Sequence, residues 1–502
     1  MSKWKLTLSH TVSKILIALL ITTITCAQEH HHHQEASTVS SLGSVSFPIS
    51  CPTGDQEEFN RGVALLHSFS YRNARLEFQQ ISLRDPSCAM AYWGEAMSLY
   101  RQLWARPTAK ELADGAKLIQ QAKAVPIQTN RERAFVDAAA AFYGGDPATA
   151  FETRRSAYSE AMKRVHASWP NDEEASLFYA LSLLTSPDAK KNDFAITREA
   201  IVLISGVFQR NPNHPGAAHY LIHACDNPVL APDGLAAARR YAEIAPASPH
   251  AVHMPSHIFA RLGMWDEDIE SNLASVQVAK QQRSFPDMLH AMNFLEYAYL
   301  QKGDFDQAKQ IETEALEVPK EDLTEMEGMF NYVRVRFPSL YLLETHDWET
   351  AQSVPVPLDA EPDFQAVMYW TRAVASGHLG NVEAAQTAVA NFDTKLDDVR
   401  KTGYAYVADS MIGERDEAHA WLAFAKGQME NAVTLMTRVA DKQDREGKGE
   451  VELPAREMLA DMLLAGGRPA EALNEYRLCL RTDPNRRNSL LGAKRAETLV
   501  AR

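Results

Sequence analysis

The sequence lacks the common signatures of cofactor and hydrolase sites. Its 502 residues contain no HExxH pair, no phosphate-binding P-loop, no GxGxxG segment after a strand and no nucleophile elbow. Segments with the alternating pattern of β-strands are essentially absent as well. We therefore expect none of the chemistries that depend on these motifs, and we expect an all-α mature chain.

Basic runs and long apolar segments are also scarce. The formal net charge is −14, and lysine and arginine nowhere form a run. Such a chain has no electrostatic footprint for a phosphate backbone or an anionic membrane surface. Beyond the N-terminus, no apolar segment approaches the length that spans a bilayer. We expect neither a nucleic-acid partner nor a transmembrane segment in the mature chain.

The N-terminus has the pattern of an export signal. Three lysines in the first 14 residues accompany an apolar run over residues 15–21, and Thr25, Cys26 and Ala27 offer a small-residue cleavage site. The pattern predicts a signal peptide over residues 1–27 and a periplasmic or secreted protein. Acylation of Cys26 would instead give a lipoprotein; soluble export is favoured because Thr25 is bulkier than a lipoprotein signal prefers.

Residues 28–54 are expected to form a flexible leader that contains four consecutive histidines, His30 to His33. Such a tract can capture metal ions. If cleavage follows Ala27, His30 becomes the third residue, and its imidazole could complete a square-planar Cu(II) or Ni(II) site with the free amine and two amides. A disordered polar leader without metal is the alternative.

A recurring turn divides the C-terminal half at intervals of 40, 43, 34, 47 and 40 residues. Each turn separates two segments with the apolar period of a helix. Glycine suits this position because it adopts the left-handed backbone that ends a helix. The turns begin at Gly263, Gly303, His346, Gly380, Gly427 and Gly467.

The N-terminal half follows the same pattern. Helices are expected over residues 59–69 and 73–82, Asp85-Pro86 closes the unit because proline cannot continue a helix, and Tyr92-Trp93-Gly94 opens the next helix. This series resembles the tetratricopeptide repeat (TPR) over residues 55–499. The resemblance implies an all-α, TPR-like right-handed superhelical solenoid of antiparallel helix pairs, whose concave face binds a protein, a peptide or a small molecule.

The cysteine spacing fits this repeat. Cys51 and Cys88 stand 37 residues apart, close to one repeat length, and export permits a disulfide between them. Because sequence alone does not give connectivity, the pairing stays open.

Histidines gather in one part of the chain, with seven of the seventeen between residues 214 and 290. His219 and His223 have i, i+4 spacing and therefore share a helix face. His253 and His257 repeat that spacing 34 residues later, at equivalent positions of the next repeat. Neighbouring helices are thus expected to direct imidazoles toward one region, as helical scaffolds do around a metal.

Alignment on Gly263 and Gly303 places His290, Asn293 and Tyr297 at the positions of His250, His253 and His257. The expected metal ligands are His219, His223, His253, His257 and His290, and the expected second-shell residues are Asp226, Asn293, Tyr297, His214 and His250. Copper, zinc and iron all accept imidazole ligands. The alternative is a structural or proton-linked polar network. Pro255 either kinks the helix between His253 and His257 or begins a new helix.

Two segments carry a narrower resemblance. HPGAxHYxIH over residues 214–223 and PHAxHMPSHIF over residues 249–259 are similar to those of a group of exported bacterial TPR proteins without an assigned activity. The resemblance supports a site at these histidines but implies no reaction.

Three functions remain open. The favoured one is a binding scaffold with a histidine metal centre on its concave face. The second is a copper, iron or zinc enzyme with its active site in the His214–His290 cluster, where Tyr220 or Tyr297 assists and Asp226 or Glu296 acts as base. The third is a periplasmic metal carrier.

Overall fold

Helices make up the regular structure of the computed structural model, which describes residues 42–51, 54–103, 106–191, 193–323, 328–402, 405–447 and 451–502. No strand occurs in these ranges. The expected signal peptide and His30 to His33 lie outside them. Residues 38–502 form one unit.

The first half of this unit contains α1 (Gln56–His67), α2 (Tyr71–Arg84), α3 (Ala89–Met97), α4 (Ala109–Ala124), α5 (Asn130–Tyr143), α6 (Phe151–Ser168), α7 (Glu173–Leu184), α8 (Ala195–Arg210), α9 (Pro215–Cys225), α10 (Ala231–Ile244), α11 (Pro249–His253), α12 (Pro255–Leu262) and α13 (Trp265–Gln282).

The second half contains α14 (Phe285–Lys302), α15 (Phe305–Leu316), the short 3-10 helix η2 (Lys320–Leu323), α16 (Met329–Glu344), α17 (Trp348–Ala351), α18 (Pro362–His378), α19 (Val382–Lys401), α20 (Ala405–Ser410), α21 (Ile412–Ala425), α22 (Met429–Glu446), α23 (Ala455–Ala465), α24 (Pro469–Thr482) and α25 (Arg487–Val500).

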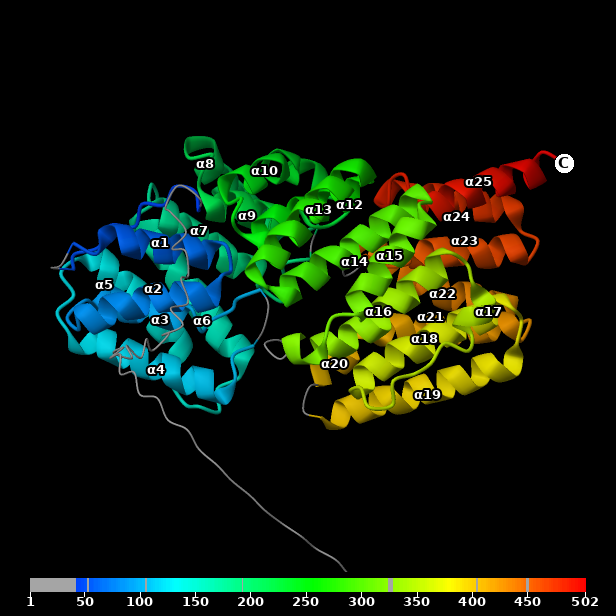
Figure 1. The fold of residues 1–502 in the computed structure, drawn as a ribbon, viewed down its shortest axis with the longest axis horizontal. Helices are drawn as coiled ribbons and strands as arrows, with labels where there is room; N and C mark the ends of the chain where they lie inside the picture. The colour runs from blue at the N-terminus through cyan, green and yellow to red at the C-terminus, as the bar shows by residue number, and fades with distance from the viewer. Residues whose placement is uncertain are drawn as a thin grey trace, which may run out of the picture. The chain divides into compact units, whose positions relative to one another are not determined.

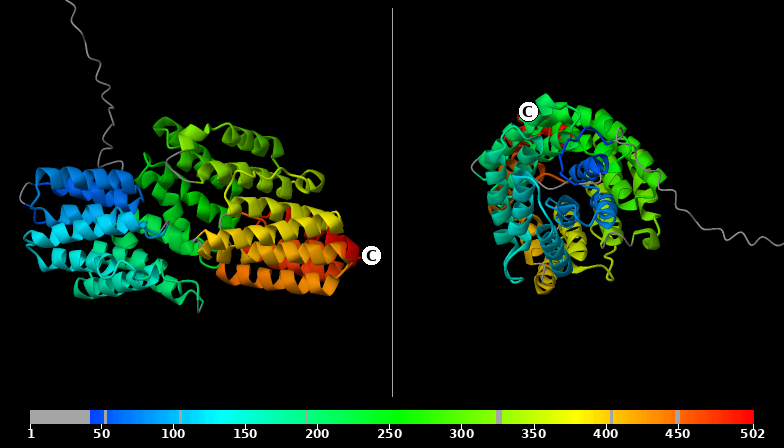
Figure 2. Two further views of the ribbon diagram at one scale, coloured as in Figure 1. Left: turned by 90° about the horizontal axis from the view of Figure 1, so that it is seen from below. Right: turned by 90° about the vertical axis from the view of Figure 1, so that its left-hand side faces the viewer.

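The helices pack in chain order as antiparallel pairs (Figures 1 and 2). Each helix contacts the next, and the first helices of consecutive pairs also touch, as α1 does α3 and α7 does α9. One pair cannot bury its apolar face alone, so stacking of neighbours creates a continuous core. The all-α, TPR-like solenoid expected from the sequence is confirmed.

The recurring turns adopt the left-handed backbone that their glycines predict. Gly263, Gly303, Gly380, Gly427 and Gly467 all have positive φ values, between 64° and 80°. His346 occupies the same position in its repeat and has a φ of 58°, a conformation that a residue with a Cβ rarely adopts. The repeat geometry thus persists where the glycine is missing.

The Tyr92-Trp93-Gly94 segment shows how closely neighbouring helices approach. A Cβ at Gly94 would lie 2.4 Å from the Phe78 ring, so α2 packs directly on the backbone of α3. Trp93 is almost fully buried beside Phe47, Phe59 and Phe135. The aromatic–glycine pair therefore belongs to the helix packing.

The leader differs from the sequence expectation of flexibility up to residue 54. Residues 42–51 are extended and packed against the array, with Phe47 fully buried. The Phe47 N–H donates to Asn60 Oδ1 at 3.0 Å and Ser50 N–H to Glu132 Oε1 at 2.7 Å. The prediction failed because Phe47 supplies apolar surface, and side chains of α1 and α5 satisfy the extended backbone.

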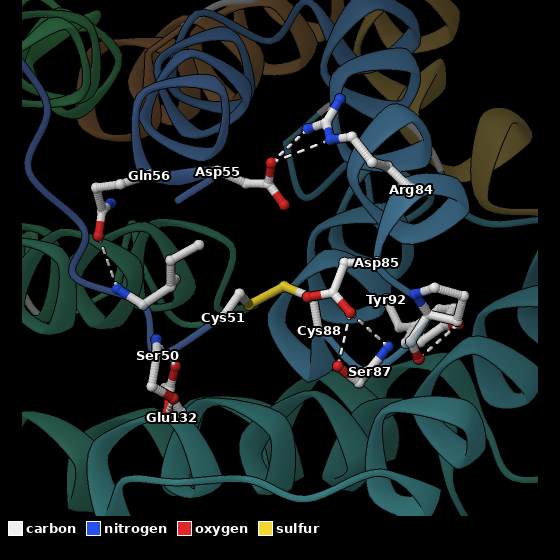
Figure 3. Close-up of a disulfide and its surroundings, with 12 residues drawn as sticks. Ser50, Cys51, Asp55, Gln56, Arg84, Asp85, Ser87, Cys88, Tyr92 and Glu132 are labelled. Atoms are coloured by element: carbon white, nitrogen blue, oxygen red, sulfur yellow. Dashed lines mark hydrogen bonds and ion pairs between the residues drawn. A yellow bond between two sulfur atoms is a disulfide. The ribbon is translucent and has the colours of Figure 1, made fainter. Parts of the chain in front are cut away.

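Cys51 and Cys88 form a disulfide (Figure 3), with their Cα atoms 5.0 Å apart. The bond joins the end of the extended segment to the residue before α3. Close by, Arg84 at the end of α2 pairs with Asp55, which precedes α1. The first two helix pairs are thereby joined covalently and by an ion pair.

Loss of this disulfide should destabilise the N-terminal repeats. The bond closes a loop of 37 residues, for which loop entropy predicts about 4 kcal/mol. A Cys51→Ser/Cys88→Ser variant should therefore unfold in its N-terminal helices at lower urea, as measured by hydrogen exchange of α1 to α3. Reductant should produce the same loss in the parent protein and none in the variant. Equal stability of the oxidised parent and the variant would contradict this role.

Candidate metal centre

The first three-histidine group, called trio A, consists of His219, His223 and His250. His219 and His223 lie one turn apart on α9, and His250 lies in the first turn of α11. His219 Nε2 is 3.0 Å from His223 Nε2 and 3.0 Å from His250 Nε2. His219 and His250 are buried, whereas His223 is partly exposed.

Trio B consists of His253, His257 and His290. His253 ends α11, His257 lies in the first turn of α12, and His290 comes from α14. The Nε2 atoms of His253 and His257 are 3.1 Å apart, and the rings of His253 and His290 lie 4.6 Å apart between centroids. In each trio, the candidate ligand atoms all lie within 4.8 Å of one another.

Pro255 separates α11 from α12 without separating His253 from His257. It is the first residue of α12, where its missing N–H costs no helical bond, and Met254 between the helices keeps a helical backbone with φ −51° and ψ −34°. The sequence left open whether Pro255 kinks a helix or begins one. It begins a new helix, and the two imidazoles still converge.

The nitrogen separations match those of ligands on one ion. Two imidazole nitrogens bound at about 2.0–2.1 Å and at angles between square and tetrahedral lie roughly 2.8–3.4 Å apart. The three Nε2 pairs at 3.0–3.1 Å fall within this range. Each trio therefore presents nitrogens at the spacing of adjacent metal ligands.

Hydrogen bonds at Nδ1 fix the protonation of three of these rings. His219 Nδ1 donates to the His67 carbonyl at 2.6 Å, and His257 Nδ1 donates to Asp226 Oδ2 at 2.9 Å. Because each acceptor is a carbonyl or carboxylate oxygen, the proton resides on Nδ1 and leaves Nε2 as a lone pair.

His253 is fixed through an amide. Its Nδ1 donates to Asn272 Oδ1 at 2.7 Å, and Asn272 Nδ2 in turn donates to the Asp268 carbonyl at 3.0 Å. The Asp268 contact determines which end of the amide faces the ring. His253 and His257 therefore direct two nitrogen lone pairs at each other across 3.1 Å. This contact is repulsive unless a cation or a shared proton lies between them.

Burial keeps several of these rings neutral. It lowers the pKa of His219, His250 and His253 well below the usual histidine range, and neighbouring imidazoles add to the effect. Burial, followed by repulsion from His257, lowers the pKa of His223 to about 3. Neutral imidazole is the form that binds metal ions.

The two trios are adjacent and related by one repeat. The rings of His223 and His257 lie 6.5 Å apart between centroids, and α9 and α14 both contact α12 (Figure 1). Shifting trio A by 34, 34 and 40 residues gives trio B. The repeat has thus produced two equivalent three-histidine groups side by side.

A further buried group contains His214 with His67 and Glu174. Glu174 accepts from His67 Nε2 at 2.7 Å and from His214 Nε2 at 3.1 Å, while His67 Nδ1 contacts the Tyr220 hydroxyl at 2.8 Å. These contacts form a closed hydrogen-bond network. It reaches trio A through the His67 carbonyl, so it supports His219 from behind.

The sequence placed His250 outside the ligand set because it follows a proline at a helix start. The structure brings it to His219, and its repeat equivalent is His290 in trio B. Asp226 lies where a second-shell residue was expected, with one oxygen on His257 and the other 2.8 Å from Arg261 Nε. Asn272 and Asp268 were not predicted, since they lie on α13 and carry no spacing signal.

Two expected second-shell residues have partners elsewhere. Asn293 Oδ1 accepts from the Tyr332 hydroxyl at 3.0 Å, and the Tyr297 hydroxyl accepts from Arg486 Nη1 at 2.8 Å. α14 has no break corresponding to Met254, so residues aligned with His253 and His257 turn toward α16 and α25. The structure groups neither of them with the imidazoles.

The fold and this site together define an all-α, TPR-like helical-repeat protein with two adjacent three-histidine groups. No family model and no curated protein matches the chain. Among solved structures it is similar to the human IFIT1 dimer with m7Gppp-AAAA (11% identity, TM-score 0.38, covering 87% of this chain and 95% of that chain).

It is also similar to yeast Tom70 (10% identity, TM-score 0.35, covering 90% and 89%) and to the P58(IPK) TPR domain (13% identity, TM-score 0.21, covering 89% and 98%). All three scores lie below 0.5. They therefore carry no argument about the site or its function.

Proposed function

We propose that this chain is an exported metalloprotein whose TPR-like scaffold holds two transition-metal ions, one in trio A and one in trio B. The observation that carries the proposal is the pair of Nε2 lone pairs of His253 and His257, fixed by Asn272 and Asp226 and only 3.1 Å apart. A metal ion at this point replaces a repulsion with two coordinate bonds.

The arrangement also supports a metal-dependent reaction. Three protein ligands leave a coordination position open, as catalytic sites do, whereas closed structural sites use four. His223, His257 and His290 are partly exposed, so a small molecule can approach from their side. The enzyme and carrier alternatives both need this centre, and the open position favours the enzyme.

The disulfide supports export. Disulfides persist in oxidising compartments, and Cys51 and Cys88 are already joined in the fold. No helix in the described ranges combines the length and apolar character needed to cross a membrane. The proposal places the protein in the periplasm or outside the cell, with the concave face free for a protein, peptide or small-molecule partner.

Metal counting tests the proposal. Protein that begins after residue 34, without the histidine tract, is reconstituted with copper, zinc or iron(II), desalted and measured by elemental analysis. We expect about two ions per chain. A His219→Ala/His250→Ala variant should retain one ion, and so should a His253→Ala/His257→Ala variant, because each change removes two ligands from one trio.

His419→Ala is the matched control. His419 is partly exposed and bonds Asp393 through Nε2 at 3.0 Å, away from both trios, so its loss should leave two ions bound. Circular dichroism checks that each variant keeps its helices. A folded parent protein that binds less than one ion with every metal contradicts the proposal and leaves the shared proton as the explanation of the 3.1 Å contact.

A further inference from the structure

One phenylalanine ring covers each trio. The Phe69 ring lies 4.4, 5.4 and 6.2 Å from the rings of His219, His223 and His250. The Phe294 ring lies 4.9, 4.6 and 5.5 Å from those of His253, His257 and His290. Both phenylalanines are buried. Each group of ligands is therefore walled by an apolar ring that contacts all three imidazoles.

Phe69 holds its place in a strained backbone. It follows the end of α1 with a φ of 56°, at a position where glycine is usual and a bulky residue is a rare outlier. Such strain costs about 1–3 kcal/mol and is typical of functional sites. The ring that this conformation directs onto trio A is a reason for the strain to be kept.

The charges around the trios favour an ion of low charge. Both groups consist of histidine alone, with no aspartate, glutamate or cysteine among their ligand atoms in the described ranges. Asp226 borders trio B, but Arg261 is paired with it and offsets its charge. Asp268 behind His253 is fully buried, and burial raises its pKa well above the usual aspartate range, so it is neutral.

Two divalent ions would place four positive charges in this site, whereas two copper(I) ions would place only two. The cost of burying charge rises steeply when no counter-charge is present. Imidazole is a good copper ligand, and copper also heads the affinity order of the first-row metals. Among the metals that imidazole accepts, copper is the one with a stable monovalent state.

Resting on the proposed function, we infer that the paired trios hold two copper(I) ions and that dioxygen is the molecule that binds between them. Dioxygen is small and apolar enough to pass the phenylalanine rings. Each copper(I) gives up one electron to become copper(II), and the dioxygen takes up both electrons and becomes peroxide held by the two ions. No proton or further reductant enters this balance.

Anaerobic loading separates this inference from the function on which it rests. The protein lacking the histidine tract receives copper(I) under argon, is desalted, and is then exposed to a measured amount of dioxygen. We expect two coppers per chain before exposure and uptake of one dioxygen per two coppers. The copper X-ray absorption edge should shift to copper(II), without the paramagnetic resonance signal of isolated copper(II), because the adjacent ions couple.

The possible failures differ in meaning. Fewer than two coppers per chain overturns the two-ion centre itself. Two coppers that stay copper(I) in dioxygen, or that give the full resonance signal of uncoupled copper(II), overturn only the dioxygen inference. Tighter binding of zinc than of copper(I) in direct competition does the same.

The phenylalanine cover has its own test. Phe294→Ala should speed the removal of copper(I) by a bulky sulfonated chelator at least tenfold while changing the removal by cyanide much less, because only the large molecule is held back by the ring. Phe337→Ala, which removes a fully buried ring of α16 from a different cluster, is the matched control and should change neither rate. Equal acceleration by both variants would show general loosening and contradict the cover.

Discussion

An Asp226→Asn variant should bind the metal ion of trio B 10- to 100-fold more weakly, while trio A keeps its affinity. The carboxylate holds His257 in the tautomer that frees Nε2, and loss of such a partner costs an affinity of about this size. The amide of asparagine cannot replace it. Its oxygen would accept from His257 only by turning its NH₂ group toward Arg261 Nε, which is itself a donor.

Competition with a chelator of known affinity measures the change, with the two trios separated by repeating the titration on the His219→Ala/His250→Ala background. Asp233→Asn, an exposed carboxylate on α10, is the matched control and should have no effect. Unchanged affinity in Asp226→Asn would show that His257 does not bind the ion through Nε2.

Replacing Arg486 with methionine should destabilise the C-terminal repeats by about 3–5 kcal/mol. Arg486 is fully buried before α25, where it pairs with Glu344 of α16 at 2.8 Å and with Glu457 of α23 at 2.7 Å. It also donates to Tyr297 of α14. Removal of the guanidinium leaves two buried carboxylates without a counter-charge, which costs much more than the loss of one ion pair at the surface.

The pH dependence of that variant has a definite sign. Without Arg486, the folded-state pKa values of Glu344 and Glu457 lie above the unfolded value of about 4.3. Their ionisation then opposes folding, so the deficit in unfolding free energy grows as the pH rises above 4.3 and shrinks as the pH falls toward it.

Urea titrations at several pH values measure this deficit. Arg468→Met, which removes an exposed arginine paired with Glu430 and Glu471, should show little change at any pH. A deficit in Arg486→Met that is the same at pH 4 and pH 8 would contradict the electrostatic explanation.

Repetition in the sequence predicts most of the fold and much of the site. The 34-residue step from His219 to His253 and from His223 to His257 correctly placed these four imidazoles on neighbouring helices, because TPR-like repeats stack in register. The same alignment equated His290 with His250, so the sequence already held the signal that both act alike. We missed it by treating the proline before His250 as evidence for a capping role alone.

The remaining partners depend on orientation rather than on period. Asn293 and Tyr297 align with His253 and His257, but α14 is continuous where Pro255 divides the preceding repeat, and the side chains turn elsewhere. Phe69 lies about 150 residues before the histidines that it covers, in a turn where the sequence pattern would favour glycine. No local spacing reveals such a contact, because it arises only when the helices stack.

The most direct test of the two-ion centre is anomalous diffraction from crystals reconstituted with copper. We expect two anomalous peaks per chain at the copper edge, one among the Nε2 atoms of His219, His223 and His250, and one among those of His253, His257 and His290. A single shared peak, or peaks only at surface histidines, would contradict the account.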